Sequence, residues 1–252
     1  MQKTDYTKEF ISIFDKFRYK YPKWKVWNDF LYLSAVSMAN LIPTAERKER
    51  EKRYQAIWNS YPVEYRELMP QLLAVVIAAL DENPEQDFLG SLYHRLELHQ
   101  QQKGQFFTPY HVSHLMAELQ FAGTDLDELK SNNYISVNDP ACGAGAMLIA
   151  FANVAKSHGI NYQKNVLFIA QDIDQTAALM CYIQLAFLGC PAVIIVGDSL
   201  LKPDFHPDNT IWYTPFFWMN QWKFRDVFGN KEVPDNEIAK NKQKKKKMQR
   251  NF

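Results

Sequence analysis

The sequence predicts an α/β fold with a parallel half-sheet of about four strands, preceded by an α-helical region. Two observations lead to this prediction. In residues 1–103 apolar side chains recur at three- and four-residue spacing, with no alternation of period two. From residue 134 onward, short β-branched runs alternate with helical stretches, which is typical of a parallel sheet with crossover helices.

The first hundred residues predict one helix after another. The expected ranges are 5–19, 25–42, 45–58, 63–80 and 86–100. In the first of them Phe10, Phe14 and Phe17 share one face, as the core side of an amphipathic helix requires. Pro70 lies inside the fourth range and predicts a kink or a break there, because proline removes a helical hydrogen bond.

The later part predicts a helix over 111–119 and then strands alternating with helices. The expected strands are 135–140, 165–173, 192–200 and 210–217, and the helices between the first three are 146–158 and 175–188. Gly159 and Gly189 follow these two helices as stop signals. Asp174 stands where it can cap the second helix.

Composition excludes several classes of protein. The longest apolar run, Leu72–Leu80, is nine residues long, whereas a membrane span needs ~20. The N-terminus lacks the apolar stretch of a secretory signal. The cysteines Cys142, Cys181 and Cys190 form no CxxC pair, so we expect neither a disulfide framework nor a cysteine-built metal site. These features favour a cytoplasmic protein, and we predict no metal ligands.

Charged residues are unevenly distributed along the chain. The last fourteen residues hold seven Lys or Arg and no acid, which leaves 22 basic against 28 acidic residues, a net charge of −6, in residues 1–238. We therefore expect a helical region over 1–103, a second domain over 104–230, and a basic, disordered tail over 231–252. The tail could contact phosphates or serve only as a solubilising terminus.

A glycine-rich turn, DPACGAG (Asp139–Gly145), lies between the first strand and the next helix. Gly143 and Gly145 allow a sharp turn and a close approach of the backbone to a ligand. The turn is not a P-loop, because it lacks GK[ST]. It is not a GxGxxG fingerprint either, because Leu148 occupies the position of the last glycine. Taken alone, a purely structural turn explains it equally well.

Two further acids follow the next two strands. Asp172 can accept the hydroxyls of a ribose, although an ordinary loop acid is the alternative, and Asp198 ends the third strand. Together with Asp139, these carboxylates suit a ligand that is rich in donors and cationic. They would repel a diphosphate, so the pattern favours an adenosine that carries a sulfonium and an amino acid over a dinucleotide.

The segment GQFFTP (104–109) could fold over such a ligand from the loop ahead of the first strand, although core packing is the default for its phenylalanines. With this segment included, the four motifs GQFFTP, DPACGAG, AQDID and GDSL resemble, in order and spacing, those of N6-adenine DNA methyltransferases. The resemblance is specifically to the modification subunit of type I restriction-modification systems, and it covers residues 87–200.

This resemblance implies a Rossmann-like core that binds S-adenosyl-L-methionine. The residues that would wrap around the cofactor are Gln105, Phe106, Thr108 and Pro109. Those that would cradle its methionine part are Asp139, Pro140, Ala141, Gly143, Ala144 and Gly145. Asp172 would hold the ribose, and Asp198 would contact the adenine.

The chain departs from the family at the catalytic motif. The family has Asn-Pro-Pro-Phe or Asn-Pro-Pro-Tyr after the fourth strand, whose amide and carbonyl oxygens accept hydrogen bonds from the target amine. This chain has Thr214, Pro215, Phe216 and Phe217 there. The resemblance assigns catalysis to Thr214, Pro215 and Phe217, but a threonine hydroxyl is shorter and differently aimed than an amide. An aromatic strand edge without chemistry is the alternative.

The functional expectation is an S-adenosylmethionine-dependent DNA adenine N6-methyltransferase-like protein, with weak or absent activity by itself. Only thirty-five residues follow Phe217, too few for a seven-stranded sheet and a target-recognition domain. We therefore expect DNA to be reached through a specificity or partner subunit. The alternative is a non-catalytic cofactor-binding subunit or regulatory module of a DNA-modification or mobile-element complex.

Overall fold

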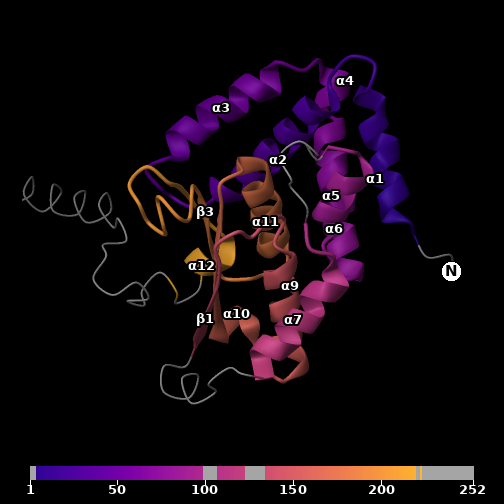
Figure 1. Cartoon of the computed structure of the whole chain (residues 1–252). Helices are drawn as coiled ribbons and strands as arrows, with labels where there is room; N and C mark the ends of the chain where they lie inside the picture. The colour runs from indigo at the N-terminus through magenta and orange to yellow at the C-terminus, as the bar shows by residue number, and fades with distance from the viewer. Residues whose placement is uncertain (1–3, 99–106, 123–133, 220–221, 223–252) are drawn as a thin grey trace, which may run out of the picture.

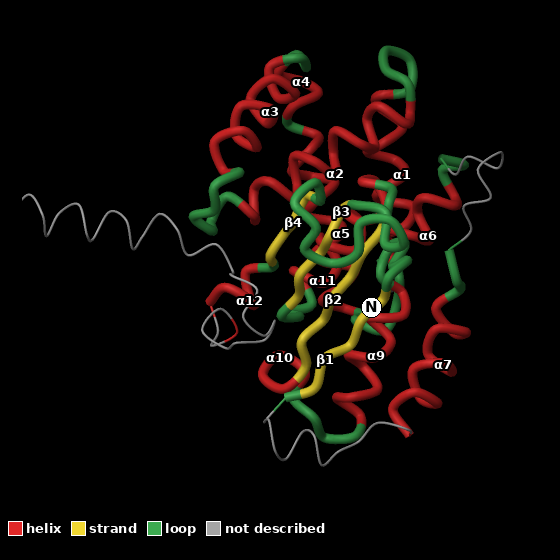
Figure 2. Tube along the Cα trace, turned by 60° about the vertical axis from the view of Figure 1, so that its left-hand side comes forward, coloured by secondary structure: helices red, strands yellow, loops and turns green. Residues whose placement is uncertain are grey.

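The computed structural model describes residues 4–98, 107–122, 134–219 and 222. Its centre is a four-stranded sheet in which the strands neighbour one another in chain order. The strands are β1 (Ile135–Asp139), β2 (Val166–Asp172), β3 (Ala192–Val196) and β4 (Thr210–Tyr213). β1, β2 and β3 are parallel, as predicted, whereas β4 runs antiparallel to β3 (Figure 2).

Helices surround this sheet (Figure 1). They are α1 (Tyr6–Phe14), the 3₁₀ turn η1 (Asp15–Phe17), α2 (Lys23–Ala39), α3 (Arg47–Asn59), α4 (Val63–Arg66), α5 (Leu68–Glu82), α6 (Phe88–Arg95), α7 (Tyr110–Ala122), α9 (Ala146–Ser157), α10 (Tyr162–Asn165), α11 (Gln175–Phe187) and α12 (Pro215–Met219). None of the helices described is long and apolar enough to cross a membrane.

The helical prediction for the N-terminal region is confirmed, including the break near Pro70, except that the last predicted range, 86–100, ends as a helix at Arg95 and its residues 99–100 lie outside the described residues. The range 63–80 divides into α4 and α5, and Pro70 lies in the first turn of α5. A proline is tolerated there because the first backbone N–H groups of a helix have no partner within it.

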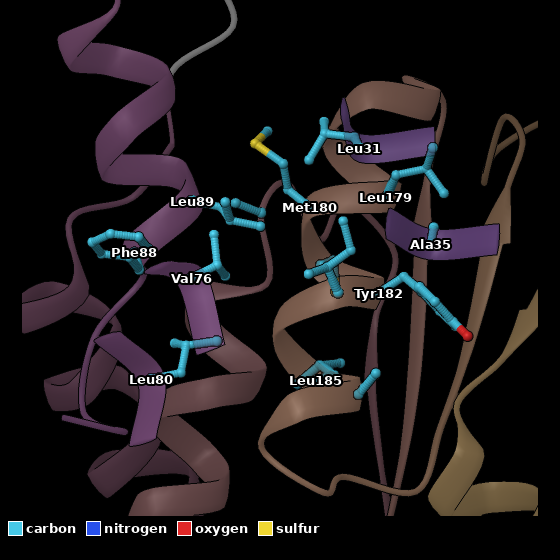
Figure 3. Close-up of a cluster of buried hydrophobic side chains, with 14 of the residues drawn as sticks. Leu31, Ala35, Val76, Leu80, Phe88, Leu89, Leu179, Met180, Tyr182 and Leu185 are labelled. Atoms are coloured by element: carbon cyan, nitrogen blue, oxygen red, sulfur yellow. The ribbon is translucent and has the colours of Figure 1, made fainter. Parts of the chain in front are cut away.

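One face of the sheet carries most of the core. α9 and α11 pack on it, and α2, α5 and α6 pack on α11 in turn. Figure 3 shows α11 between these helices: Met180 and Leu185 lie near Val76, Leu80 and Leu89, while Leu179 and Tyr182 lie toward α2. Described residues on both sides of the predicted boundary at residue 103 therefore share one continuous hydrophobic core. The division into domains stays a prediction, and the predicted tail over 231–252 lies outside the described residues.

The opposite face of the sheet has a smaller core. Leu167, Val193 and Ile195 point to this side and are fully buried with Phe217 of α12 and Trp222. Strand residues alternate between the two clusters, as the period of two in a strand requires.

The last predicted strand, 210–217, is wrong in its second half and in its direction. It ends at Tyr213, and residues 215–219 form α12 instead. A parallel strand needs a crossover that returns the chain to the same end of the sheet, usually through a helix. Residues 197–209 contain no helix, and the buried side chain of Gln171 holds this loop at the carboxyl ends of the strands by bonding Lys202 O (2.9 Å) and Asp204 N (3.0 Å). The chain can then only run back antiparallel.

Candidate cofactor site

The carboxyl ends of β1, β2 and β3 bring the three predicted acids to one edge of the sheet. Backbone hydrogen bonds tie the loops that follow these strands to one another: Cys142 N donates to Gln171 O and Gly197 N donates to Asp172 O, both at 2.9 Å. The edge is therefore a single connected structure, in the position where open α/β sheets bind ligands.

The glycine-rich turn needs both of its glycines, for different reasons. Gly143 has φ +53° and Gly145 has φ +94°, a region that residues with a Cβ rarely adopt. A Cβ on Gly145 would stand 2.8 Å from Sγ of Cys181, so this glycine allows α9 to pack on α11. A Cβ on Gly143 would stand 2.9 Å from the Phe107 ring. Gly143 therefore lies directly beneath the loop that precedes α7.

Asp172 joins the second strand to this turn. Its carboxylate accepts from Gly143 N at 2.9 Å through one oxygen and from Asp174 N at 2.8 Å through the other. Each carboxylate oxygen has two lone pairs, so both retain the capacity to accept from a ligand. Asp174 instead caps α11 through Thr176 N at 2.8 Å, as predicted.

The electrostatics of this edge favour a cation. Burial raises the pKa of Asp172 and of Asp139, and the negative charge of Asp172 raises the pKa of Asp139 further. Within the described part of the chain, no cationic side chain forms an ion pair with Asp139, Asp172 or Asp198. A positively charged ligand would compensate these carboxylates, whereas a diphosphate would add to the repulsion.

The other predicted residues of the turn and of the third strand are placed around the same edge. Asp139 accepts from Ala141 N at 3.1 Å, and Asp198 accepts from Leu200 N at 2.9 Å. Pro140 and Ala141 are exposed, whereas Ala144 is buried beneath them. These local bonds fix each acid at the start of its loop and orient it without using all of its acceptor capacity.

The segment ahead of α7 is described only from Phe107. Thr108 and Pro109 are exposed at the start of α7, and the predicted residues Gln105 and Phe106 lie outside the described residues. Phe107, which was not among the predicted site residues, packs against Tyr93 with ring centroids 5.4 Å apart and covers Gly143. The sequence shows two adjacent phenylalanines, and its pattern does not indicate which of them reaches the turn.

Exposed apolar side chains next to the acids were also missed. Ile173 follows Asp172 and is 72% exposed, and Leu200 follows Asp198 by two residues and is 91% exposed. Both side chains follow strand ends at the carboxyl edge of the sheet and are open to solvent there. The available signal was an apolar residue one position after Asp172 and two positions after Asp198 in the sequence.

The threonine motif lies at the other end of the sheet. Because β4 is antiparallel, its end at Tyr213 pairs with Val193 near the start of β3, far along the strand from Asp198. Thr214 is fully buried; its hydroxyl donates to Cys190 O at 2.7 Å and accepts from Ala192 N at 2.8 Å. Phe217 is buried in the smaller core and Pro215 begins α12. The structure does not bring these residues together with the carboxylates.

Comparisons with known proteins identify a family. A model of the family described as N-6 DNA Methylase matches residues 85–251. The chain is 32% identical over 106 residues to the type I restriction enzyme MjaVIII methylase subunit of Methanocaldococcus jannaschii. That match covers 41% of this chain and 16% of the relative, so the chain spans only a small part of the relative's length. No solved structure matches the chain significantly.

Proposed function

Because the chain belongs to the N-6 DNA methylase family, we propose that the carboxyl edge of its sheet binds S-adenosyl-L-methionine as part of a DNA adenine N6-methyltransferase-like protein. The observation that carries the proposal is the bond from Gly143 N to Asp172, 2.9 Å long. It joins the glycine-rich turn to an acid that has acceptor capacity left and that, in the described part of the chain, forms no ion pair with a cationic side chain. A ligand with both hydroxyls and a positive charge fits this arrangement.

Each residue is assigned to the part of the ligand that its chemistry suits. Asp172 would accept the ribose hydroxyls, and Asp198 would accept from the adenine amine. The turn at Asp139–Gly145 would hold the methionine part, with Asp139 facing the cationic end. Ile173 offers an exposed apolar surface beside Asp172 for the flat face of the base. When bound, the cofactor supplies an electrophilic methyl group on its sulfonium.

We further propose that methyl transfer does not proceed through Thr214, Pro215 and Phe217. A catalytic acceptor must reach the target amine, which requires a free lone pair at the edge where the cofactor binds. The hydroxyl of Thr214 is fully buried at the opposite end of the sheet, where it bonds Cys190 O and Ala192 N, so it cannot reach an amine at the cofactor edge. The acceptor for the target amine would then be another group, in this chain or in a partner. This favours a cofactor-binding subunit of a DNA-modification or mobile-element complex over an enzyme that acts alone.

DNA and a specificity subunit are the proposed partners. The support is the family and the relative, whose name is that of a methylase subunit. The basic residues of 239–252 are a second proposed contact with DNA phosphates. If they bind, removing them should weaken DNA affinity and flatten its dependence on salt, because fewer counterions are released.

Transfer of radiolabelled methyl from S-adenosylmethionine to unmethylated duplex DNA tests the proposal as a whole. The purified chain should give no transfer above background, and the addition of cell extract with its partner should restore transfer. Robust turnover by the purified chain would overturn the assignment as a cofactor-binding subunit. Failure of the purified chain to bind the cofactor in a parallel titration would overturn the site itself.

A further inference from the structure

Gln184 connects the glycine-rich turn to the N-terminal helical region. It lies on α11 and is fully buried, although glutamine is mostly an exposed residue. Its Nε2 donates to Ala144 O at 2.9 Å and to Asp87 Oδ1 at 2.8 Å, and its Oε1 accepts from Leu89 N at 3.0 Å. One side chain thus contacts the turn and the first residues of α6.

The partner of Gln184 in the helical region is itself held firmly. Asp87 caps α6 and accepts from Gly90 N at 2.8 Å. A Cβ on Gly90 would collide with the Asp87 carboxylate, so the glycine allows the carboxylate to sit against the helix. Because α6 packs on α5 and α11, Gln184 is anchored to the main core rather than to a mobile loop.

The other end of this connection is the peptide between the two glycines of the turn. Ala144 separates Gly143 and Gly145, both of which have positive φ. Glycines leave a backbone free to adopt other conformations, so the turn needs external bonds to keep one shape. α11 supplies one such bond and one packing contact from the same face: Gln184 bonds Ala144 O, and Cys181, three residues earlier, packs on Gly145.

We propose that Gln184 is a positioning residue for the cofactor turn, which makes the start of α6 part of the cofactor site although it contacts no cofactor. Only a side-chain amide serves here, because the position requires two donors and an acceptor at once. A carboxylate lacks the donors, and an apolar side chain would leave Ala144 O and Leu89 N without the partner that Gln184 supplies and Asp87 with one donor fewer. This inference rests on the proposed function.

The test compares two buried or half-buried amides that join the same parts of the molecule. Gln184→Met removes the bond to the turn. Asn153→Leu is the matched control: Asn153 on α9 donates to Pro84 O at 2.9 Å and to Tyr110 Oη at 3.1 Å, so it links α9 to the segment before α6 without touching the turn. Both variants are titrated with S-adenosylhomocysteine, well below the melting temperature of each.

We expect Gln184→Met to bind about five- to tenfold more weakly than wild type, the effect of one or two lost hydrogen bonds on the pre-formed turn. Asn153→Leu should bind as wild type does, even where it melts as early as the methionine variant. Equal affinities of Gln184→Met and wild type, or equal losses in both variants, would overturn the inference, because only stability would then be at work.

A second readout separates this inference from the proposed function. Hydrogen exchange of the amides of residues 142–146, measured without cofactor, should be faster in Gln184→Met and unchanged in Asn153→Leu. If wild type binds no cofactor, the proposed function fails and this exchange alone decides the positioning role. Unchanged exchange in Gln184→Met would overturn it.

Gln184→Glu covers the case in which the methionine variant does not fold. The new carboxyl faces both Ala144 O and the buried carboxyl of Asp87. Between about pH 8 and pH 6 it takes up a proton, and its single O–H can then donate to Ala144 O, although the second donor of the amide stays missing. Its affinity, as a ratio to that of wild type at each pH, should therefore recover in part as the pH falls. A ratio that stays constant with pH would contradict the positioning role.

Discussion

Gly143 is constrained both by its backbone and by its neighbour. Its φ of +53° already disfavours a side chain, and the Phe107 ring occupies the space that a Cβ would need. Gly159 separates the two effects: its φ is +78°, but nothing lies within 4 Å of the position of its Cβ. The turn that we assign to the cofactor can therefore be tested against a turn with similar backbone strain and no neighbour.

We predict that Gly143→Ala and Gly159→Ala each lower the free energy of unfolding by about 1–2 kcal/mol, the strain of a left-handed residue. Only Gly143→Ala should also weaken cofactor binding, because Phe107 must move away from the turn. Urea unfolding and calorimetric titration of both variants check this. Unchanged affinity in Gly143→Ala would show that the turn serves the fold alone.

Thr214 gives a second test at the level of a single residue. Its hydroxyl is the local partner of Cys190 O and Ala192 N at the start of β3. We predict that Thr214→Val, which keeps the shape, lowers the free energy of unfolding by about 1–3 kcal/mol because two buried backbone groups lose their partner. Thr214→Ser should keep most of the stability.

The place of Thr214 at the end of the sheet opposite the cofactor edge predicts that Thr214→Asn gains no methyl-transfer activity, since an amide there cannot reach that edge. A measurable gain in labelled methyl on DNA would place Thr214 in the catalytic centre and contradict the site described here.

The pKa of Asp172 predicts a dependence of stability on pH. Burial raises this pKa above its ordinary value of 3.8, so the fold favours the protonated acid. The resulting stabilisation is fully present below pH 3.8 and is lost as the pH rises through the raised pKa. We predict that the unfolding free energy of wild type falls more steeply with rising pH than that of Asp172→Asn. Parallel curves for the two proteins would contradict this environment for Asp172.

At the scale of elements, α3 is joined to the sheet by one buried cation. Arg50 donates to Ile211 O at 2.6 Å, and its guanidinium lies 4.1 Å from the centre of the Trp212 ring, both on β4. Burial lowers the pKa of Arg50 because the charged form loses its hydration. The neighbouring Arg53 makes a similar contact with the Tyr32 ring, at 4.0 Å, but is exposed.

We predict that Arg50→Met lowers the free energy of unfolding by about 1–3 kcal/mol, because Ile211 O loses a charged donor and Trp212 loses its cation. Arg53→Met on the same helix should lower it by about 0.5 kcal/mol, the value of an exposed cation–π contact. Thermal unfolding of the two variants checks that Arg50→Met loses more stability than Arg53→Met. Equal losses would mean that Arg50 does not hold α3 to β4.

The sequence predicted the elements whose hydrophobic period is clear and missed those set by distant contacts. The N-terminal helices and the first three strands follow from apolar spacing, and the acids at Asp172 and Asp198 follow from the strand ends. The direction of β4 does not, because it depends on how Gln171, far away in the sequence, holds the loop at residues 197–209. Contacts between distant elements, such as that of the Phe107 ring with the backbone at Gly143, leave no periodic pattern in the sequence.

At the scale of the whole molecule, the helical region and the sheet form one structure. Side chains of α2, α5 and α6 share a single core with α9 and α11, and β2 and β3 contribute Phe168 and Ile194 to it. The hydrogen bonds of Gln184 extend this continuity from the core to the cofactor turn. The N-terminal region is thus placed to influence the site through the core.

The central claim, that the carboxyl edge of the sheet binds S-adenosylmethionine, is tested most directly by calorimetric titration of wild type, Asp172→Ala and Asp174→Ala. Asp174 lies on the same loop but caps α11, so its loss should reduce stability by about 1 kcal/mol and leave affinity nearly unchanged. We predict that wild type binds and that Asp172→Ala binds more weakly by about 1–3 kcal/mol, because ribose hydroxyls and Gly143 N lose their acceptor. Equal affinities of wild type and Asp172→Ala would contradict the account.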